Sequence, residues 1–416
     1  MTRLAVRYPA ACGGVLHCLK KRIGIIGGGI LGLAVAYRIQ ERDPSIEVVL
    51  FEKEDGPGKH QSCHNSGVLH CGLYYKPGSL KANLAVEGIR SMVGFCREHK
   101  IDHELCGKVV VASDEREKKI LEALAQRGSQ NGLIGLKFLG SSELKCREPH
   151  VNATASLLVP EEGIVDYPAV MATIASLIEA RGGKIFYNSP VIAVHTQADE
   201  TLIIQTPRHE IAVDQLICCA GLQSDRVYRS LTGEHPPLKI IPFRGEYRKL
   251  LPEASELVNH LVYPVPDPLY PFLGVHFTRL VHGGREVGPN AVLALKREGY
   301  RISDFSPYDA VDALSYPGFI RFLSKNFRFT LGEFQSSLSK EHFLAKAKKL
   351  IPEIKQEHLA DGTAGVRAQA VARDGTLVMD FVIKSVGRQI HVLNAPSPGA
   401  TASFAIARHI VQEYVF

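Results

Sequence analysis

The stretch Arg22-Ile23-Gly24-Ile25-Ile26-Gly27-Gly28-Gly29-Ile30-Leu31-Gly32-Leu33 decides the fold, together with Val48-Val49-Leu50-Phe51-Glu52-Lys53, which follows after a helix-length gap. Residues 23–26 are predicted to form a buried parallel strand, and a second strand ends at Glu52. Between the strands, a G-x-G-x-x-G pattern is completed by Gly27, Gly29 and Gly32. Strand, glycine turn, helix, second strand and terminal acid together predict a βαβ unit that binds a dinucleotide.

Each part of this unit has a physical role in the predicted site. Gly27 permits a tight turn, Gly29 leaves room for a pyrophosphate, and Gly32 lets the helix pack closely on the strand. The phosphates are expected at the free N–H groups of the helix N-terminus, and Glu52 can accept hydrogen bonds from a ribose. A glycine-rich turn without a ligand is the alternative, and the complete structural context of the motif disfavours it.

The charge of the chain is concentrated at its start. The 416 residues carry a formal net charge of +6, with 45% hydrophobic and 22% charged residues, which is a globular composition. Five of the 49 Lys and Arg lie within residues 1–22, which contain no acid, and removing them leaves 44 basic against 43 acidic residues. The body of the protein is therefore electrostatically balanced, which argues against nucleic-acid binding.

Residues 1–21 are basic, free of acids and rich in small residues, which is typical of a mitochondrial transit peptide. A leader without a targeting role is the alternative. The nine cysteines include no C-x-x-C pair, which indicates a reducing compartment rather than a disulfide scaffold. We find no transmembrane helix in the sequence, so any membrane contact is expected to be peripheral.

The pattern of elements predicts an α/β protein with a Rossmann-like cofactor domain and an inserted antiparallel β-sheet domain that binds the substrate. The strand at residues 216–219 is expected to return to the sheet of residues 22–52. The cofactor domain is then discontinuous, comprising residues 22–112, 163–234 and 360–416, and residues 113–162 and 235–359 form the substrate domain. Helices are expected at residues 80–98, 114–127, 141–149, 168–181, 339–351 and about 400–413.

Several strings of the chain resemble a known family of flavoenzymes. The glycine motif, His64-Asn65-Ser66-Gly67-Val68-Leu69-His70 and Cys219-Ala220-Gly221-Leu222-Gln223-Ser224-Asp225 resemble the D-amino-acid-oxidase superfamily. Within it, residues 61–77, 241–247, 263–266, 271–277, 288–291, 365–370 and 394–398 are similar to the L-2-hydroxyglutarate dehydrogenases. The resemblance covers residues 22–416. It implies that FAD-dependent hydride transfer converts L-2-hydroxyglutarate to 2-oxoglutarate, in animals within mitochondria, with electrons passed to a non-oxygen acceptor such as a quinone.

The resemblance also implies which residues contact FAD. Adenosine and pyrophosphate would lie at Gly27, Gly29, Gly32, Glu52 and Lys53, with the adenine at Val191. The flavin ring would lie along Asn65, Ser66, Gly67 and Val68, and the ribityl and phosphate groups would lie near Ala220 and Gly221. The last helix is expected to start near Ser397, Gly399, Ala400 and Thr401, with its N–H groups directed at the flavin O2 edge. Pro396, Pro398 and Ala400 replace glycines that are common in the superfamily.

Oxidation of a 2-hydroxy acid requires a base for the hydroxyl proton, and histidine has a suitable pKa for this role. His70 follows the segment expected beside the flavin and is the first candidate, with His276 as a rival or helper. Either histidine could instead pack against or hydrogen-bond the flavin.

A dicarboxylate substrate needs cationic groups, and guanidinium groups bind carboxylates bidentately. The resemblance places Arg367 at the carboxylate-binding position, and Arg244 could face the same cavity. Structural salt bridges are the alternative role for both arginines. Tyr263, Tyr74 and Asn290 are weaker candidates for substrate hydrogen bonds.

Further hypotheses concern metal binding, covalent flavin attachment, membrane contact and other functions on the same fold. Zinc could be bound by His60, Cys63, His64, His70 and Cys71. Ligands that are adjacent in sequence are poorly spaced for a metal, so no metal site is predicted. One of these residues could instead attach the flavin covalently. Residues 316–329 combine Phe319, Phe322, Phe327 and Phe329 with basic residues and could contact a membrane. The competing functions are an amine or amino-acid oxidase on the same fold and a non-catalytic assembly factor.

Overall fold

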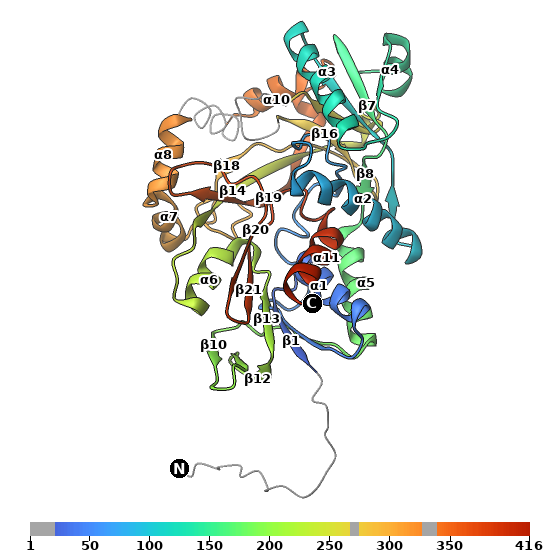
Figure 1. Cartoon of the computed structure of the whole chain (residues 1–416). Helices are drawn as coiled ribbons and strands as arrows, with labels where there is room; N and C mark the ends of the chain where they lie inside the picture. Colours follow the sequence, from blue (N-terminus) through green and yellow to red (C-terminus); the bar gives the residue numbers. More distant parts are fainter. Residues whose placement is uncertain (1–20, 267–273, 327–338) are drawn as a thin grey trace, which may run out of the picture.

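The computed structural model describes residues 21–266, 274–326 and 339–416, and it contains two large sheets with helices packed around them (Figure 1). The α-helices in this part of the chain are α1 (Ile30–Arg42), α2 (Leu80–Glu98), α3 (Glu115–Gln130), α4 (Ser141–Arg147), α5 (Tyr167–Ala180), α6 (Ser224–Thr232), α7 (Pro307–Leu314), α8 (Pro317–Lys325), α10 (Lys340–Lys348) and α11 (Ser403–Tyr414).

The first sheet contains the predicted βαβ unit. Its strand order is β20-β21-β13-β1-β2-β9, and every pairing is parallel except that of β20 with β21. The strands are β1 (Arg22–Ile26), β2 (Glu47–Phe51), β9 (Lys184–Phe186), β13 (Gln215–Cys218), β20 (Val382–Val386) and β21 (Gln389–Asn394). The pairing of β13 with β1 confirms that the chain returns to this sheet after a long excursion.

Helix α1 lies close to this sheet because its glycine permits it. A Cβ on Gly32 would collide with the carbonyl oxygen of Gly27, so the close approach of helix and turn requires glycine here. Helix α1 also contacts α5 and α11, and α2 packs on α11. The helices expected at residues 80–98, 114–127, 141–149, 168–181 and 339–351 are confirmed to within a few residues.

The second sheet has nine strands in the order β18-β14-β17-β16-β15-β5-β7-β6, with β19 paired to the other edge of β14. These strands are β5 (Lys108–Ala112), β6 (Lys137–Phe138), β7 (Ala155–Val159), β14 (Leu238–Leu250), β15 (Leu261–Pro264), β16 (His276–Arg279), β17 (Arg285–Gly288), β18 (Val292–Leu293) and β19 (Leu359–Ala372). The sheet is antiparallel except for the parallel pair β5 and β15. Strands β5 and β19 pair here although the predicted division assigned nearly all their residues to the cofactor domain; that division stays a prediction.

Two three-stranded sheets complete the fold. One contains β10 (Ala193–Thr196), β11 (Leu202–Gln205) and β12 (Glu210–Val213). The other has the strand order β3-β8-β4 and contains β3 (Val68–Leu69), β4 (His103–Glu104) and β8 (Gly163–Val165). The fold class predicted from the sequence is confirmed.

Three local expectations need correction. Helices α7 and α8 lie in a region predicted to be β-structure; both have proline in the first turn, which permits a helix start as readily as a loop. Phe319 and Phe322, for which membrane contact and core packing were the alternatives, are buried with Phe243 in the core. Phe327 and Phe329 lie outside the described residues, as do residues 1–20 of the leader.

The last helix begins at Ser403, later than expected, because residues 398–402 form turns in which the Ala402 N–H donates to the Pro398 carbonyl at 2.9 Å. Within the residues that the structure describes, no helix is both long and apolar enough to cross a membrane.

Candidate active site

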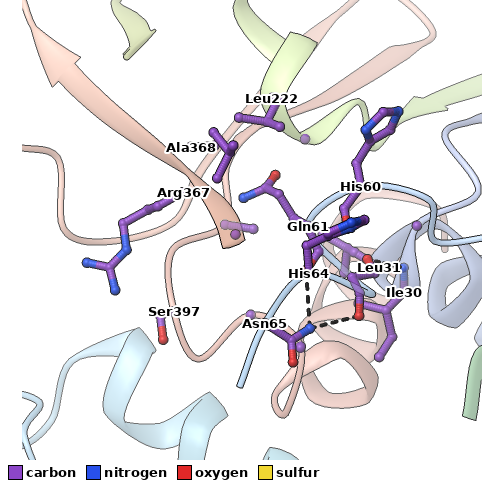
Figure 2. Close-up of a pocket in the computed structure, with 18 of the residues that line it drawn as sticks. Ile30, Leu31, His60, Gln61, His64, Asn65, Leu222, Arg367, Ala368 and Ser397 are labelled. Atoms are coloured by element: carbon purple, nitrogen blue, oxygen red, sulfur yellow. Dashed lines mark hydrogen bonds between the residues drawn. The ribbon is translucent and has the colours of Figure 1, made fainter. Parts of the chain in front are cut away.

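A cavity of about 660 Å³ extends from the glycine turn after β1 to the nine-stranded sheet. Figure 2 shows Arg367 and Ser397 on one side of it and the segment with His60, Gln61, His64 and Asn65 on the other. Both large sheets therefore contribute residues to one continuous cavity.

The end of the cavity at α1 fits the adenosine and pyrophosphate of a dinucleotide. Helix α1 begins at Ile30 after the N-cap Gly29, and Ser62 Oγ accepts a hydrogen bond from the Ile30 N–H at 3.0 Å. Gly29, Ile30 and Leu31 line the cavity, so this helix N-terminus faces the space in which an anion would bind. Glu52 is buried beside it, and its carboxylate accepts hydrogen bonds from the N–H groups of Gly28 at 2.6 Å and Glu54 at 2.9 Å. Lys53 lines the cavity and forms an ion pair with Glu298 at 3.0 Å.

The segment expected beside the flavin ring is held by Asn65. Its Nδ2 donates to the carbonyl oxygens of Gln61 at 3.1 Å and Ser62 at 2.8 Å (Figure 2), and its Oδ1 accepts from the Gly67 N–H at 2.9 Å. Gly67 has a φ of +67°, a conformation that favours glycine. Asn65 therefore fixes the turn that leads into β3 and His70.

The loop before α11 closes the cavity from the opposite side. Thr401 is buried, and its Oγ1 lies 2.7 Å from the Tyr167 hydroxyl and accepts a hydrogen bond from the His70 N–H at 3.2 Å. The loop thus contacts the backbone of the first candidate base directly.

The two candidate bases have different environments. His70 Nδ1 lies 3.3 Å from Glu162 Oε2, whereas His276 Nδ1 donates to the Gly274 carbonyl at 2.9 Å. The Tyr263 ring stacks on His276 with centroids 3.9 Å apart and meets His70 edge-on at 6.4 Å. Burial lowers the pKa of His276 to about 3, so this ring is neutral at physiological pH.

Glu162 and Lys108 were missed by the sequence reasoning. Lys108 Nζ lies 2.8 Å from Glu162 Oε1, and both side chains are essentially inaccessible to water. Burial opposes ionisation of Glu162, but the charges of Lys108 and His70 outweigh it and lower its pKa to about 2. The only sequence signal was a lysine at the start of the otherwise apolar strand β5.

The cationic side chains of the cavity differ from those expected. Arg367, on β19, lines the cavity, and burial lowers its pKa. Arg244 is not among the lining residues; its guanidinium binds Glu246 at 3.1 Å and the Arg301 carbonyl at 2.9 Å. Lys81, on α2, was not predicted but lines the cavity and is buried.

Most other predicted site residues are brought together. The cavity is lined by Gly27, Gly29, Glu52, Lys53, Asn65, Ser66, Val68, Tyr74, Val191, Ala220, Gly221, Tyr263, Asn290, Ser397, Gly399, Ala400 and Thr401. Gly32 and Gly67 act through the backbone and do not line it. The Asn290 side chain is engaged by β14, because its Oδ1 accepts from the Glu246 N–H at 2.8 Å.

One group of potential metal ligands lies in the described part of the chain, formed by Glu54, His60 and Glu298. Lys53 Nζ lies 2.9 Å from His60 Nε2 and 3.0 Å from Glu298, and it also pairs with Glu54. The ammonium already supplies the positive charge that a cation would bring. This group therefore differs from the His/Cys set considered in the sequence.

The α/β fold, the glycine turn and the buried acid at the end of β2 define a protein that binds a dinucleotide cofactor. The chain belongs to the FAD-dependent oxidoreductase family, whose members it matches over residues 22–413, and its cofactor is FAD. The N-terminus of α1 lies at this cavity and has the chemistry that binds a pyrophosphate, and Asn65, Ser66 and Val68 line the same cavity.

Two relatives with an assigned function cover nearly the whole chain. The L-2-hydroxyglutarate dehydrogenase of Indibacter alkaliphilus is 49% identical over 92% of this chain and 96% of its own length. The mitochondrial L-2-hydroxyglutarate dehydrogenase of Homo sapiens is 42% identical over 94% of this chain and 88% of its own.

Solved structures support the fold. The L-α-glycerophosphate oxidase of Mycoplasma pneumoniae, solved with FAD bound, has a TM-score of 0.76 and 22% identity over 95% of both chains. The glycine oxidase of Geobacillus kaustophilus has a TM-score of 0.72 and 17% identity over 95% of both chains.

Proposed function

We propose that the protein oxidises L-2-hydroxyglutarate to 2-oxoglutarate. The observation that carries this proposal is a single cavity that holds His70, with its ionised partner Glu162, and two cationic side chains, Arg367 and the buried Lys81. The names of the relatives with 42–49% identity support the same substrate.

In this proposal, His70 removes the hydroxyl proton. Because an ionised carboxylate only accepts hydrogen bonds, the Glu162 contact requires the proton on His70 Nδ1, and Nε2 is then the basic nitrogen. FAD, when bound, accepts the hydride from the α-carbon of the substrate. Loss of the proton to His70 and of the hydride leaves the carbonyl of the 2-oxo acid.

His276 is better suited to a neutral role. Its Nδ1 proton is used by the Gly274 carbonyl, and burial keeps its pKa at about 3. Formation of an imidazolium there would place an unpaired charge in a buried site. We therefore assign His276 a hydrogen-bonding or packing contact rather than the base.

Arg367 and Lys81 are proposed to bind the two carboxylates. Lys81 Nζ donates to the Met379 carbonyl at 3.0 Å and lies 4.5 Å from the Tyr75 ring centroid, and it has no ion-pair partner within the described ranges. Burial, and then the charge of Arg367, lower its pKa to about 8, which indicates that the two cations influence each other. Arg244, engaged by Glu246, is not part of this proposal.

The electrons are proposed to pass to an acceptor other than oxygen, such as a quinone. The relatives are named dehydrogenases, which supports this reading. A mitochondrial location is supported by the basic leader and by the mitochondrial relatives, whereas the bacterial relative has the higher identity. Import of a fluorescent protein fused behind residues 1–21 tests the location, and diffuse cytosolic signal would contradict it.

The function is tested by anaerobic mixing of the FAD-loaded protein with L- and D-2-hydroxyglutarate separately, while the oxidised-flavin band is followed. Rapid bleaching by the L form alone is expected. Bleaching by amines instead would favour an oxidase, and no bleaching by either class would favour the assembly-factor alternative.

A further inference from the structure

The strand register brings a buried glutamate opposite His70. Strands β3 and β8 pair antiparallel, with Val68 opposite Ile164 and Leu69 opposite Gly163. The next pair in this register is His70 and Glu162, each just beyond the end of its strand. The opposition of these residues thus follows from the sheet itself rather than from a side-chain conformation alone.

The two oxygens of Glu162 face different partners. Oε2 lies 3.3 Å from His70 Nδ1, and Oε1 lies 2.8 Å from Lys108 Nζ and 3.4 Å from the Cys71 N–H. The Glu162 carbonyl also accepts from the Gly107 N–H at 2.8 Å, which ties the glutamate to the start of β5. The carboxylate is therefore fixed by both its backbone and its side chain.

The Lys108 ammonium is enclosed by aromatic rings. It lies 4.5 Å from the Tyr74 ring centroid and 5.0 Å from that of Tyr263. Burial opposes its charge, but Glu162 outweighs burial and raises the pKa of Lys108 above its usual value. A buried ion pair of this kind is costly to break, because removal of one partner leaves an uncompensated charge.

We propose that Glu162 is a positioning residue for proton abstraction: it holds the proton of His70 on Nδ1, leaves Nε2 for the substrate, and stabilises the imidazolium. Lys108 keeps Glu162 ionised and in place. The proton of the substrate hydroxyl moves to Nε2, and the Nδ1 proton stays on His70. This inference rests on the proposed function, because it assumes that His70 is the base.

His70 is then a general base whose orientation is fixed by a further group, Glu162, as in a catalytic triad. The other titratable or charged groups around His70 and Glu162 include Tyr263, His276, Tyr74, Tyr75, Cys71 and Arg367. None of these six carries a negative charge near neutral pH, since burial raises the pKa of the Cys71 thiol and of the three tyrosines. Glu162 is therefore the anion that can stabilise a cationic His70.

The test compares Glu162→Gln with Glu161→Gln in the FAD-loaded protein. Glu161 is the adjacent glutamate, but its side chain binds the surface residue Arg90 at 3.3 Å and the Ile134 N–H at 2.8 Å. Glu162→Gln is expected to lower kcat/KM about 10²- to 10⁴-fold, the usual contribution of general base catalysis, with an altered acid limb of the pH profile. Glu161→Gln is expected to match the wild type.

A double-mutant cycle separates positioning from a structural effect. In a His70→Gln background, Glu162→Gln is expected to lower kcat/KM by less than about threefold, because both substitutions remove the same function. If Glu162→Gln alone fails to fold, the paired variant Glu162→Gln with Lys108→Met avoids an unpaired buried charge and is used in the same cycle.

An equal loss in both backgrounds, or a Glu162→Gln enzyme with normal kcat/KM and pH profile, would overturn the inference. A fully active His70→Gln enzyme would overturn it as well, together with the assignment of the base. Failure of the proposed function is distinguishable, because the wild-type flavin would then not be bleached by L-2-hydroxyglutarate at all.

Discussion

Replacement of Lys81 should remove the preference for a dicarboxylate. Lys81 lies in the first turn of α2, where the free N–H groups of the helix disfavour a positive charge, and it is only 7% exposed. Burial of an ammonium there without an ion pair is unfavourable in free energy. A substrate carboxylate would supply the missing counter-charge. Because the resemblance gives Arg367 the carboxylate position shared with amino-acid oxidases, Lys81 is assigned the distal carboxylate in this proposal. We therefore expect Lys81→Met to weaken binding of that carboxylate specifically.

The magnitude follows from the contact that is lost. A hydrogen bond to a charged group contributes about 1.5–3 kcal/mol, which corresponds to roughly 10- to 100-fold in kcat/KM. The assay compares L-2-hydroxyglutarate with L-2-hydroxypentanoate, which has a methyl group in place of the distal carboxylate. Lys81→Met should lower kcat/KM for the first substrate by this factor and change the second by less than about threefold.

Lys76→Met is the matched control, because Lys76 is an exposed lysine a few residues away. It should leave both substrates unaffected. Equal losses for the two substrates in Lys81→Met, or no loss for either, would refute the reasoning. The first result would indicate a role at the cofactor or in folding, and the second would leave the distal carboxylate to another group.

The pH dependence gives an independent check. Since burial and Arg367 lower the pKa of Lys81 to about 8, its ammonium loses the proton as the pH rises through that value in the free enzyme. The ratio of kcat/KM for the dicarboxylate to that for the monocarboxylate should therefore fall above about pH 8. Lys81→Arg stays charged in this range and should flatten the dependence.

Three further predictions concern other parts of the molecule. Gly32→Ala should lower FAD affinity about 5- to 100-fold, because the added Cβ meets the Gly27 carbonyl and overpacking costs about 1–3 kcal/mol; Gly94→Ala, with open space around it, should retain FAD, as the ratio of flavin to protein absorbance would show. Arg297→Met should lower the free energy of unfolding by about 3–5 kcal/mol, measured by denaturant titration, because it leaves the buried Asp225 without its ion-pair partner. His276→Asn should keep the acid limb of the kcat/KM profile, because a group with a pKa of about 3 does not titrate in the assay range; loss of that limb would make His276 the base.

The βαβ unit could be predicted from the sequence because its information is local. Strand, glycines, helix and acid all lie within residues 22–53, and each has a fixed spacing. Helix α2 was predicted with its observed bounds, since its apolar periodicity extends over many residues. The resemblance to the flavoenzyme family, rather than periodicity, placed His70 and Arg367 at the cavity, and both residues line it.

The ion pair of Glu162 and Lys108 could not be predicted, because it depends on the pairing of β3 with β8 and on the end of β5. No local pattern specifies which strands meet. Arg244 was a candidate for the substrate with a structural salt bridge as the alternative, and Glu246 on the same strand binds its guanidinium. For Phe319, a composition typical of a membrane surface was outweighed by packing against Phe243.

The distribution of charge in the cavity explains how one site could serve both binding and proton transfer. Lys108 is neutralised by Glu162, so it adds no net attraction for the substrate and serves only to hold the carboxylate beside His70. In the proposed site, the buried Lys81, which has no ion-pair partner within the described ranges, gains a counter-charge when the distal carboxylate binds. A monocarboxylate would leave this buried cation unpaired, and such a loss is larger than the gain from an extra apolar contact. Selectivity for a dicarboxylate then follows from one desolvated cation rather than from the shape of the cavity.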